Sequence, residues 1–129
     1  MVAPHIRHAR PVVVGFGEVL WDVFHTGRRL GGSPANFSWH ARQLGARSIV
    51  VSRVGRDPAG RDLLVDLRRR GLATDHISRD PDRPTGAVSI CLMAAGIPRF
   101  TIHKQSAWDT IPWSSTLGPL ASSAASVCF

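Results

Sequence analysis

A glycine loop that leads into a helix constrains this chain more than any other feature of its sequence. Gly31 and Gly32 let the backbone turn and come close to a ligand, because neither residue carries a Cβ. Ser33 is a favoured helix N-cap, and Pro34 then takes the first helical position, where proline is best tolerated. Gly45 suits the left-handed residue that ends many helices. The segment therefore predicts a loop followed by a helix that ends at Gly45.

The predicted helix has an apolar face and a polar face. The apolar stripe, which is expected to pack on the core, consists of Phe37, Ala41 and Leu44. On another face lie Asn36, His40 and Gln43. Asn36 places its amide in the first turn, near free backbone N–H groups and the positive end of the helix dipole. Such a helix start can bind a hydroxylated or anionic small molecule, and an ordinary loop-to-helix junction is the alternative.

Apolar runs before and after this helix predict a parallel sheet with covering helices. Strands are predicted at 12–16, 19–24, 48–54, 75–78 and from 125 onward. A hairpin is predicted from 86–93 and 99–103, and a turn at 25–28. One further helix is predicted from the apolar stripe of Leu63, Leu64 and Leu67, and Gly71 is expected to end it. A weak helix through Leu117 and Leu120 is predicted, with Ser114 or Ser115 as its cap. The fold class is α/β with a β excursion.

Asp22 is the anomaly within the second strand, because a carboxylate among apolar residues is costly to bury without a partner. It either points to solvent or binds something. Its position on the carboxyl side of the first strand, where open α/β sheets bind ligands, favours binding. Gly15 and Gly17 match part of a dinucleotide fingerprint, but the third glycine is missing and the chain continues as strand. A dinucleotide cofactor is therefore rejected.

The charge balance raises the question of nucleic-acid binding. The chain has 16 Lys and Arg against 9 Asp and Glu, a formal net charge of +7. The arginines are spread along the chain, and the one run, 68–70, follows Asp62 and Asp66 on a predicted helix. No aromatic residues interleave with that run, as a single-strand-binding surface would need. A basic nucleic-acid-binding protein is therefore only the second alternative.

The rest of the composition favours a soluble, cytoplasmic domain. Cys91 and Cys128 match no metal or redox spacing and are expected to be small buried residues. Residues 1–11 lack the apolar stretch of a secretory signal and are expected to form a disordered leader before a domain at 12–129. No stretch is long and apolar enough to span a bilayer, so no membrane partner is expected.

Several motifs together resemble the ribokinase-like (PfkB) carbohydrate kinases, most of all their fructokinase branch. They are Gly17-Glu18-Val19-Leu20-Trp21-Asp22, Gly31-Gly32-Ser33-Pro34-Ala35-Asn36-Phe37-Ser38, Gly45, Val54-Gly55-x-Asp57-x-x-Gly60, Pro84-Thr85-Gly86 and Trp108-Asp109. The resemblance runs from about residue 12 to the last residue. It implies the N-terminal part of a ribokinase-like (Rossmann-like) three-layer core. It also implies a small β-strand lid, from about 19–30 and 86–103.

The family transfers the γ-phosphate of ATP to a sugar hydroxyl, with Mg²⁺ in the active site. The resemblance therefore implies a fructose-like sugar as the substrate and partner. It assigns the sugar to Asp22, Gly32 and Asn36, because a carboxylate accepts from hydroxyls, a glycine admits a backbone N–H, and an amide does both. The lid strands would close over the sugar and exclude water.

One family motif is missing. The catalytic base of the family lies in a Gly-Ala-Gly-Asp motif that does not occur in these 129 residues. Asp57 and Asp109 are structural by resemblance, so no catalytic, ATP-binding or metal-binding residue is assigned, and neither ATP nor Mg²⁺ is expected to bind the chain well. We expect a truncated form that retains the sugar site. A non-catalytic sugar-binding or interaction module is the first alternative. A homodimer through the lid strands and self-association through the truncated core both stay open.

Overall fold

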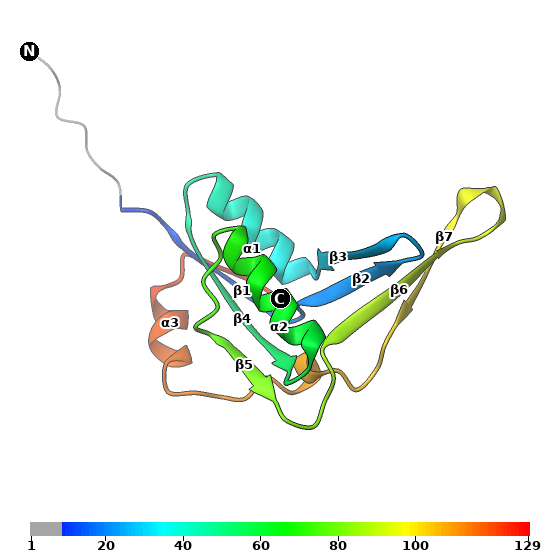
Figure 1. Ribbon diagram of the computed structural model, residues 1–129. Helices are drawn as coiled ribbons and strands as arrows, with labels where there is room; N and C mark the ends of the chain where they lie inside the picture. Colours follow the sequence, from blue (N-terminus) through cyan, green and yellow to red (C-terminus); the bar gives the residue numbers. More distant parts are fainter. Residues whose placement is uncertain (1–8) are drawn as a thin grey trace, which may run out of the picture.

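The main body of the molecule is a parallel β-sheet between two layers of helices. The computed structural model describes residues 9–129, and the strands of this sheet lie in the order β5-β4-β1-β8 (Figure 1). They are β1 (Val12–Phe16), β4 (Arg47–Gly55), β5 (Ile77–Asp80) and β8 (Ser126–Cys128). The helices α1 (Ser33–Gln43) and α2 (Pro58–Arg69) pack on one face, and α3 (Leu117–Ser123) packs on the other. The predicted α/β class and three-layer core are confirmed.

Both faces of this sheet are covered, which explains the nearly continuous apolar runs of its strands. In β4, Val50 and Val54 pack with residues of α1 and α2. Their neighbours Ile49 and Val51 point to the opposite face, where α3 lies. The apolar stripe predicted for α2 is also confirmed, because all three of its members are buried: Leu63, Leu64 and Leu67.

A second four-stranded sheet, the lid sheet, projects from the body (Figure 1). Its order is β3-β2-β6-β7, with β2 (Leu20–Phe24), β3 (Gly27–Gly31), β6 (Gly86–Leu92) and β7 (Pro98–Ile102). β2 and β6 run parallel, and the two outer pairs are antiparallel. The predicted hairpin is confirmed as β6 and β7. Two short 3₁₀ turns follow β6 and β7, η1 (Ala94–Gly96) and η2 (Ala107–Thr110).

The turn predicted at 25–28 is wrong in its extent, because residues 27–31 form strand β3. This strand exists through its antiparallel pairing with β2, in which Gly27 lies opposite Phe24 and Gly31 opposite Leu20. Its first three residues are exposed, so the strand shows no alternation of apolar and polar residues in the sequence.

The start of α1 differs from its prediction by one residue. Its N-cap is Gly32 rather than Ser33, and no side chain caps the first turn. Gly32 has a φ of 107°, a backbone conformation that favours glycine. The C-terminal prediction is confirmed, because Gly45 has a positive φ of 93° and its N–H donates to the Arg42 carbonyl.

The apolar stripe predicted for α1 is wrong. Leu44 is 89% exposed, and the buried residues of the helix are instead Pro34, Ala35 and Ser38. The cause is Gly15 in β1, where a Cβ would overlap both the Pro34 carbonyl oxygen and the Ser38 hydroxyl. The helix therefore lies close against the sheet, and only small side chains fit between them.

Smaller corrections concern caps, strand ends and cysteines. The N-cap position of α3 is Thr116, whose side chain forms no capping hydrogen bond, and not Ser114 or Ser115. Strand β5 begins two residues later than predicted. Cys91 is exposed on the lid sheet and Cys128 is only partly buried, so neither is the buried residue that we expected. Most of the predicted leader, residues 1–8, lies outside the described residues. No helix in 9–129 is long and apolar enough to cross a bilayer.

Candidate functional site

A cavity of about 400 Å³ lies between the lid sheet and the start of α1. It is lined by Glu18, Leu20, Asp22, Gly32, Ser33, Val88, Phe100, Ile102 and Trp108. These residues come from the loop after β1, three strands of the lid sheet, the glycine loop and η2. The cavity therefore forms only when segments distant in the sequence come together. It contains two of the three predicted site residues, Asp22 and Gly32.

Asp22 lies in the middle of one row of side chains across the lid sheet. It is opposite Val88 of β6, which is in turn opposite Ile102 of β7. Gly31 in β3 leaves the space that the Asp22 carboxyl group occupies, because a Cβ there would overlap the carboxyl atoms. Burial raises the pKa of the Asp22 carboxyl above its usual value. No side chain in residues 9–129 forms a hydrogen bond or ion pair with it, so its oxygens are open to a ligand that donates hydrogen bonds.

The glycine loop is fixed against the loop that follows β1. The Ser33 N–H donates to Glu18 Oε1 at 2.9 Å. A Cβ on Gly32 would overlap the Glu18 carbonyl oxygen, so the two loops pack backbone to backbone. Both Glu18 and Ser33 line the cavity, and sequence analysis did not single them out as site residues. In the sequence, only Gly32 indicated that the two loops carrying Glu18 and Ser33 come close together.

The opposite wall of the cavity is apolar. Phe100 and Ile102 on β7 are more than half exposed, and they line the cavity together with Trp108 of η2. The indole of Trp108 covers Gly86, where a Cβ would be 2.7 Å from the ring. A carboxylate on one side and aromatic and aliphatic groups on the other suit a ligand with both hydroxyl groups and C–H faces, as sugars have.

Asn36 does not line this cavity. Its side chain is exposed on the first turn of α1, and its backbone N–H donates to the Gly32 carbonyl at 3.0 Å. The structure thus brings Asp22 and Gly32 together and leaves Asn36 beside them, one helical turn further along.

Asp57 caps α2 and fastens the start of the lid strand β6. Its carboxylate accepts from the Gly60 N–H at 2.7 Å and from both the Thr85 N–H at 2.8 Å and the Thr85 hydroxyl at 2.6 Å. Burial pushes its pKa upward, but these hydrogen bonds outweigh burial and leave the pKa below its usual value. The Thr85 hydroxyl also accepts from the Gly55 N–H at 3.0 Å. With its oxygens occupied by these donors, Asp57 is a structural group.

Asp109 is also used locally. Its carboxylate accepts from the Ser106 N–H at 2.9 Å, and together these two residues form a capping box at the start of η2. Asp80 is the most buried carboxylate of the described residues. It accepts from the backbone N–H groups of Asp82 and Arg83 and pairs with Arg53 at 3.2 Å. These hydrogen bonds hold its pKa below the usual value.

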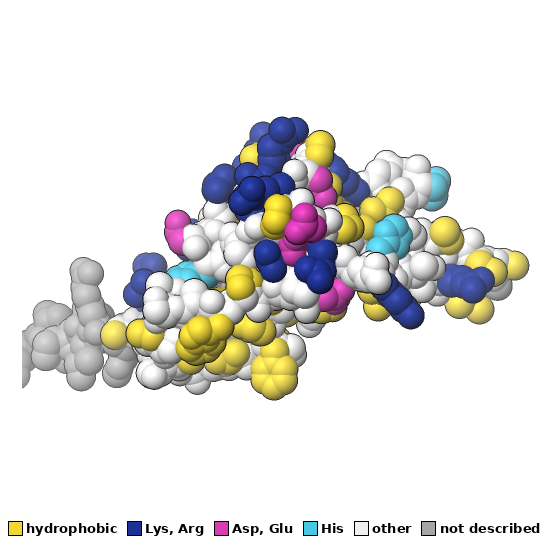
Figure 2. All heavy atoms as spheres, turned by 90° about the horizontal axis from the view of Figure 1, so that it is seen from below, with side chains coloured by type: hydrophobic (Ala, Val, Ile, Leu, Met, Phe, Trp, Pro, Cys, Tyr) yellow, Lys and Arg dark blue, Asp and Glu magenta, His cyan; other side chains and the backbone are white. Residues whose placement is uncertain are grey.

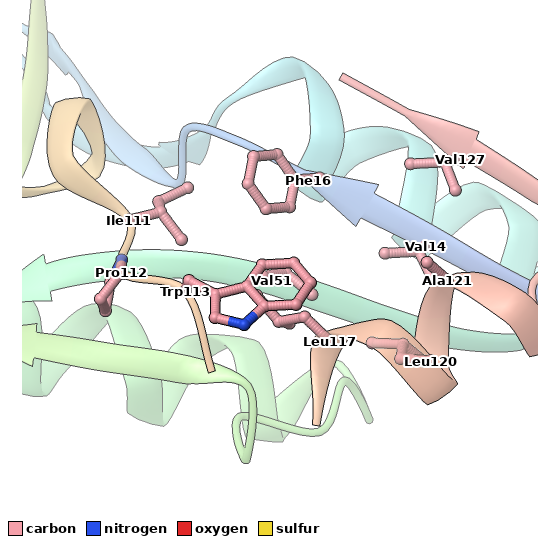
Figure 3. A pocket seen from close by; sticks show the side chains of 10 residues that line it. All are labelled: Val14, Phe16, Val51, Ile111, Pro112, Trp113, Leu117, Leu120, Ala121 and Val127. Atoms are coloured by element: carbon pink, nitrogen blue, oxygen red, sulfur yellow. The ribbon is translucent and has the colours of Figure 1, made fainter. Parts of the chain in front are cut away.

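A second cavity, of about 260 Å³, lies on the face of the main sheet that α3 covers. Figure 3 shows side chains from β1, β4, the segment before α3 and α3 itself around one space, with Phe16, Val51 and Trp113 among them. No charged residue lines it. In Figure 2, apolar side chains gather on this side of the molecule, away from α1 and α2. Because it offers only an apolar lining, this cavity does not suit a hydroxyl-rich ligand. In residues 9–129 no three or more His, Cys, Asp or Glu side chains are grouped to hold a metal ion.

The fold is an α/β domain with a cavity between the start of α1 and the lid sheet. The model of the "pfkB family carbohydrate kinase" matches residues 5–115, so the chain belongs to the pfkB family of carbohydrate kinases. This finding confirms the resemblance that the sequence motifs indicated.

Individual relatives agree with this family. The chain is 42% identical over 59 residues to a 2-dehydro-3-deoxygluconokinase of Thermoproteus tenax, a match that covers 46% of this chain and 18% of that protein. It is 30% identical over 112 residues to fructokinase-2 of Solanum habrochaites, covering 78% and 34%. The crystal structure of an uncharacterized sugar kinase from Pyrococcus horikoshii in complex with ATP superposes with a TM-score of 0.74 at 26% identity, covering 90% and 41%. The chain therefore spans less than half the length of these relatives.

Proposed function

We propose that this chain provides the sugar-binding part of an ATP-dependent carbohydrate kinase, with the cavity under the lid sheet as the sugar site. The observation that carries the proposal is the Asp22 carboxylate, which faces a cavity of about 400 Å³ and has no partner within residues 9–129. A partly buried carboxylate without a partner is stabilised when a ligand supplies hydrogen bonds to it, and sugar hydroxyls are suitable donors.

Different residues around the cavity bind different parts of the sugar. Asp22 accepts hydrogen bonds from two neighbouring hydroxyls, and Gly32 lets the sugar approach the loop backbone. Asn36, which lies just outside the cavity, binds the sugar only if the sugar extends beyond the space between α1 and the lid sheet. Phe100 and Ile102 cover the C–H face of the ring and keep water away from it.

Fructose and 2-dehydro-3-deoxygluconate are the two substrate candidates that the named relatives supply. Fructose has the larger number of neighbouring hydroxyls for the Asp22 carboxylate, and we propose it as the substrate. ATP supplies the phosphoryl group in this reaction, with Mg²⁺ to offset its charge. We propose that the groups that hold ATP and Mg²⁺, and the catalytic base, are supplied from outside these 129 residues, because the sequence lacks the Gly-Ala-Gly-Asp motif.

Calorimetric titration with fructose tests the sugar site, with Asp22→Asn as the variant. A hydrogen bond to a charged group contributes about 1.5–3 kcal/mol, so we expect the affinity to fall by a factor of about 10 to 150. Asp82→Asn is the matched control, because Asp82 is exposed and does not line the cavity. Equal affinities for the wild-type chain and Asp22→Asn would overturn the proposal. A parallel assay with ATP should show no turnover by this chain, and turnover would refute the assignment of catalysis to groups outside it.

A further inference from the structure

A third cavity, of about 500 Å³, lies at the ends of the main-sheet strands that are opposite to the sugar site. Its lining includes residues at or just before the starts of three parallel strands: Arg10 before β1, Arg47 in β4 and His76 before β5. Arg42, near the end of α1, completes the basic lining. The sugar cavity lies where β1 ends, so the two cavities are separated by the length of the strands.

The three arginines in this cavity have no acidic partner. Within residues 9–129, every ion pair of an arginine involves one of Arg28, Arg53, Arg70 and Arg83. Residues 1–8 contain no Asp or Glu, so the remaining part of the chain has no carboxylate side chain to offer. One carboxylate, Asp75, lines the cavity, but no arginine of residues 9–129 lies within 4.0 Å of it. Three exposed arginines and one carboxylate therefore line the cavity without forming an ion pair among themselves.

The negative C-terminal ends of nearby helices offset only part of the positive charge of these arginines. α1 and α2 both end near this edge of the sheet, and the C-terminal end of a helix counts as about half a negative charge. Two such ends and Asp75 together offset about two of the three positive charges. An excess remains on a concave surface, which is the arrangement that attracts an anion.

The backbone fixes the positions of two of these arginines. Arg42 packs on Gly71 after α2, where a Cβ would lie 2.7 Å from both Nε and Nη2 of the guanidinium. Gly71 also has a positive φ of 77°, so a larger residue is disfavoured there on both counts. Arg47 begins β4, and its N–H donates to the Pro11 carbonyl beside Arg10 at 2.9 Å. The guanidinium of Arg42 and the backbone of Arg47 are therefore held at defined points beside the cavity.

We propose that this cavity binds a small anion with two linked phosphate groups. Each guanidinium can donate two parallel hydrogen bonds, so three of them match the terminal oxygens of a diphosphate. The cavity volume of about 500 Å³ is large enough for such an anion, and His76 lies in the lining beside it. The site does not depend on the sugar cavity, because none of its residues lines that cavity.

Calorimetric titration of the whole chain with inorganic pyrophosphate tests this proposal. Wild-type protein should bind, and the double variant Arg42→Gln/Arg47→Gln should bind more weakly by a factor of about ten or more. The matched control, Arg56→Gln/Arg61→Gln, removes the same charge from two exposed arginines elsewhere and should stay within about twofold of wild type. No binding by wild type, or an equal loss in both double variants, would overturn the proposal.

A second measurement uses the wild-type chain alone and so is independent of how the variants fold. Proton NMR of the histidine rings should show the His76 signals moving on addition of pyrophosphate, while those of His25 and His103 stay in place. Movement of all the histidine signals alike, or of none, contradicts a defined site. Asp22→Asn should bind pyrophosphate as wild type does, so failure of the sugar site and failure of this site give different results.

Discussion

Replacing Thr85 by valine removes a hydroxyl that makes two buried hydrogen bonds at once. The hydroxyl donates to the Asp57 carboxylate at 2.6 Å and accepts from the Gly55 N–H at 3.0 Å. Valine has nearly the same shape, so no cavity forms. A hydrogen bond to a charged group contributes about 1.5–3 kcal/mol, and an orphaned buried N–H costs about 1–3 kcal/mol. We therefore expect the free energy of unfolding to fall by about 3 kcal/mol, the lower part of that combined range.

Urea denaturation followed by circular dichroism measures this loss. With a slope of about 2 kcal/mol per molar urea, the midpoint should move down by roughly 1.5 M. Thr85→Ser is the matched control, because it keeps the hydroxyl and removes one methyl group, at a cost of about 1 kcal/mol. If Thr85→Val is no less stable than Thr85→Ser, the hydroxyl contributes nothing and the argument from the two hydrogen bonds fails.

Two further predictions concern the glycine loop and acid. Gly32→Ala should lower the free energy of unfolding by about 1–3 kcal/mol, because φ is 107° and a Cβ would overlap the Glu18 carbonyl. It should also abolish fructose binding, and unchanged binding in titration calorimetry contradicts the packing described for this loop. The folded state lowers the pKa of Asp57 and Asp80, so the unfolded chain binds more protons as the pH falls. The stability they contribute is complete above an unfolded-state pKa of about 3.9 and is lost as the pH falls through their lower folded pKa, which urea midpoints measured from pH 6 downward should show. A midpoint that stays constant to pH 2 would contradict it.

The sequence was sufficient for elements whose pattern reflects burial. β1, β4 and α2 were predicted because their apolar residues face a core on one side or both, as Leu63 and Leu67 do in α2. Strand β3 was not, because its existence depends on pairing with β2 while Arg28 and Arg29 stay exposed. Backbone pairing of this kind leaves no apolar pattern to detect.

The buried face of α1 shows a second limit of sequence analysis. Helical spacing correctly groups residues on one face, but it does not say which face meets the sheet. That choice depended on Gly15, which lies about twenty residues earlier and lets Pro34 and Ser38 approach the sheet. The exposed Leu44 then follows from the same rotation.

At the candidate site, the sequence identified the unusual residue and missed its surroundings. Asp22 stood out because a carboxylate interrupts an apolar strand, and Gly32 stood out because of the loop it begins. Phe100 carries no such signal, since aromatic residues in strands are common, and Trp108 stood out only as part of the Trp108-Asp109 motif. Phe100 reaches the cavity through the pairing of β6 with both β2 and β7, and Trp108 reaches it from η2, where its indole packs on Gly86. No local pattern encodes either contact.

The attachment of β6 at Thr85 also determines how far each part of this strand moves when it rotates. β6 begins one residue after this buried anchor and runs for 7 residues to the exposed turn at η1. At 3.3 Å per residue this strand is a lever arm of roughly 23 Å, so a rotation of about 10° at the anchor displaces the far end by about 4 Å. Val88, only three residues from the anchor, moves less than half as far. For the same change in backbone angle, the row of side chains beside Asp22 therefore moves by about 1.7 Å while the tip of the strand moves by about 4 Å.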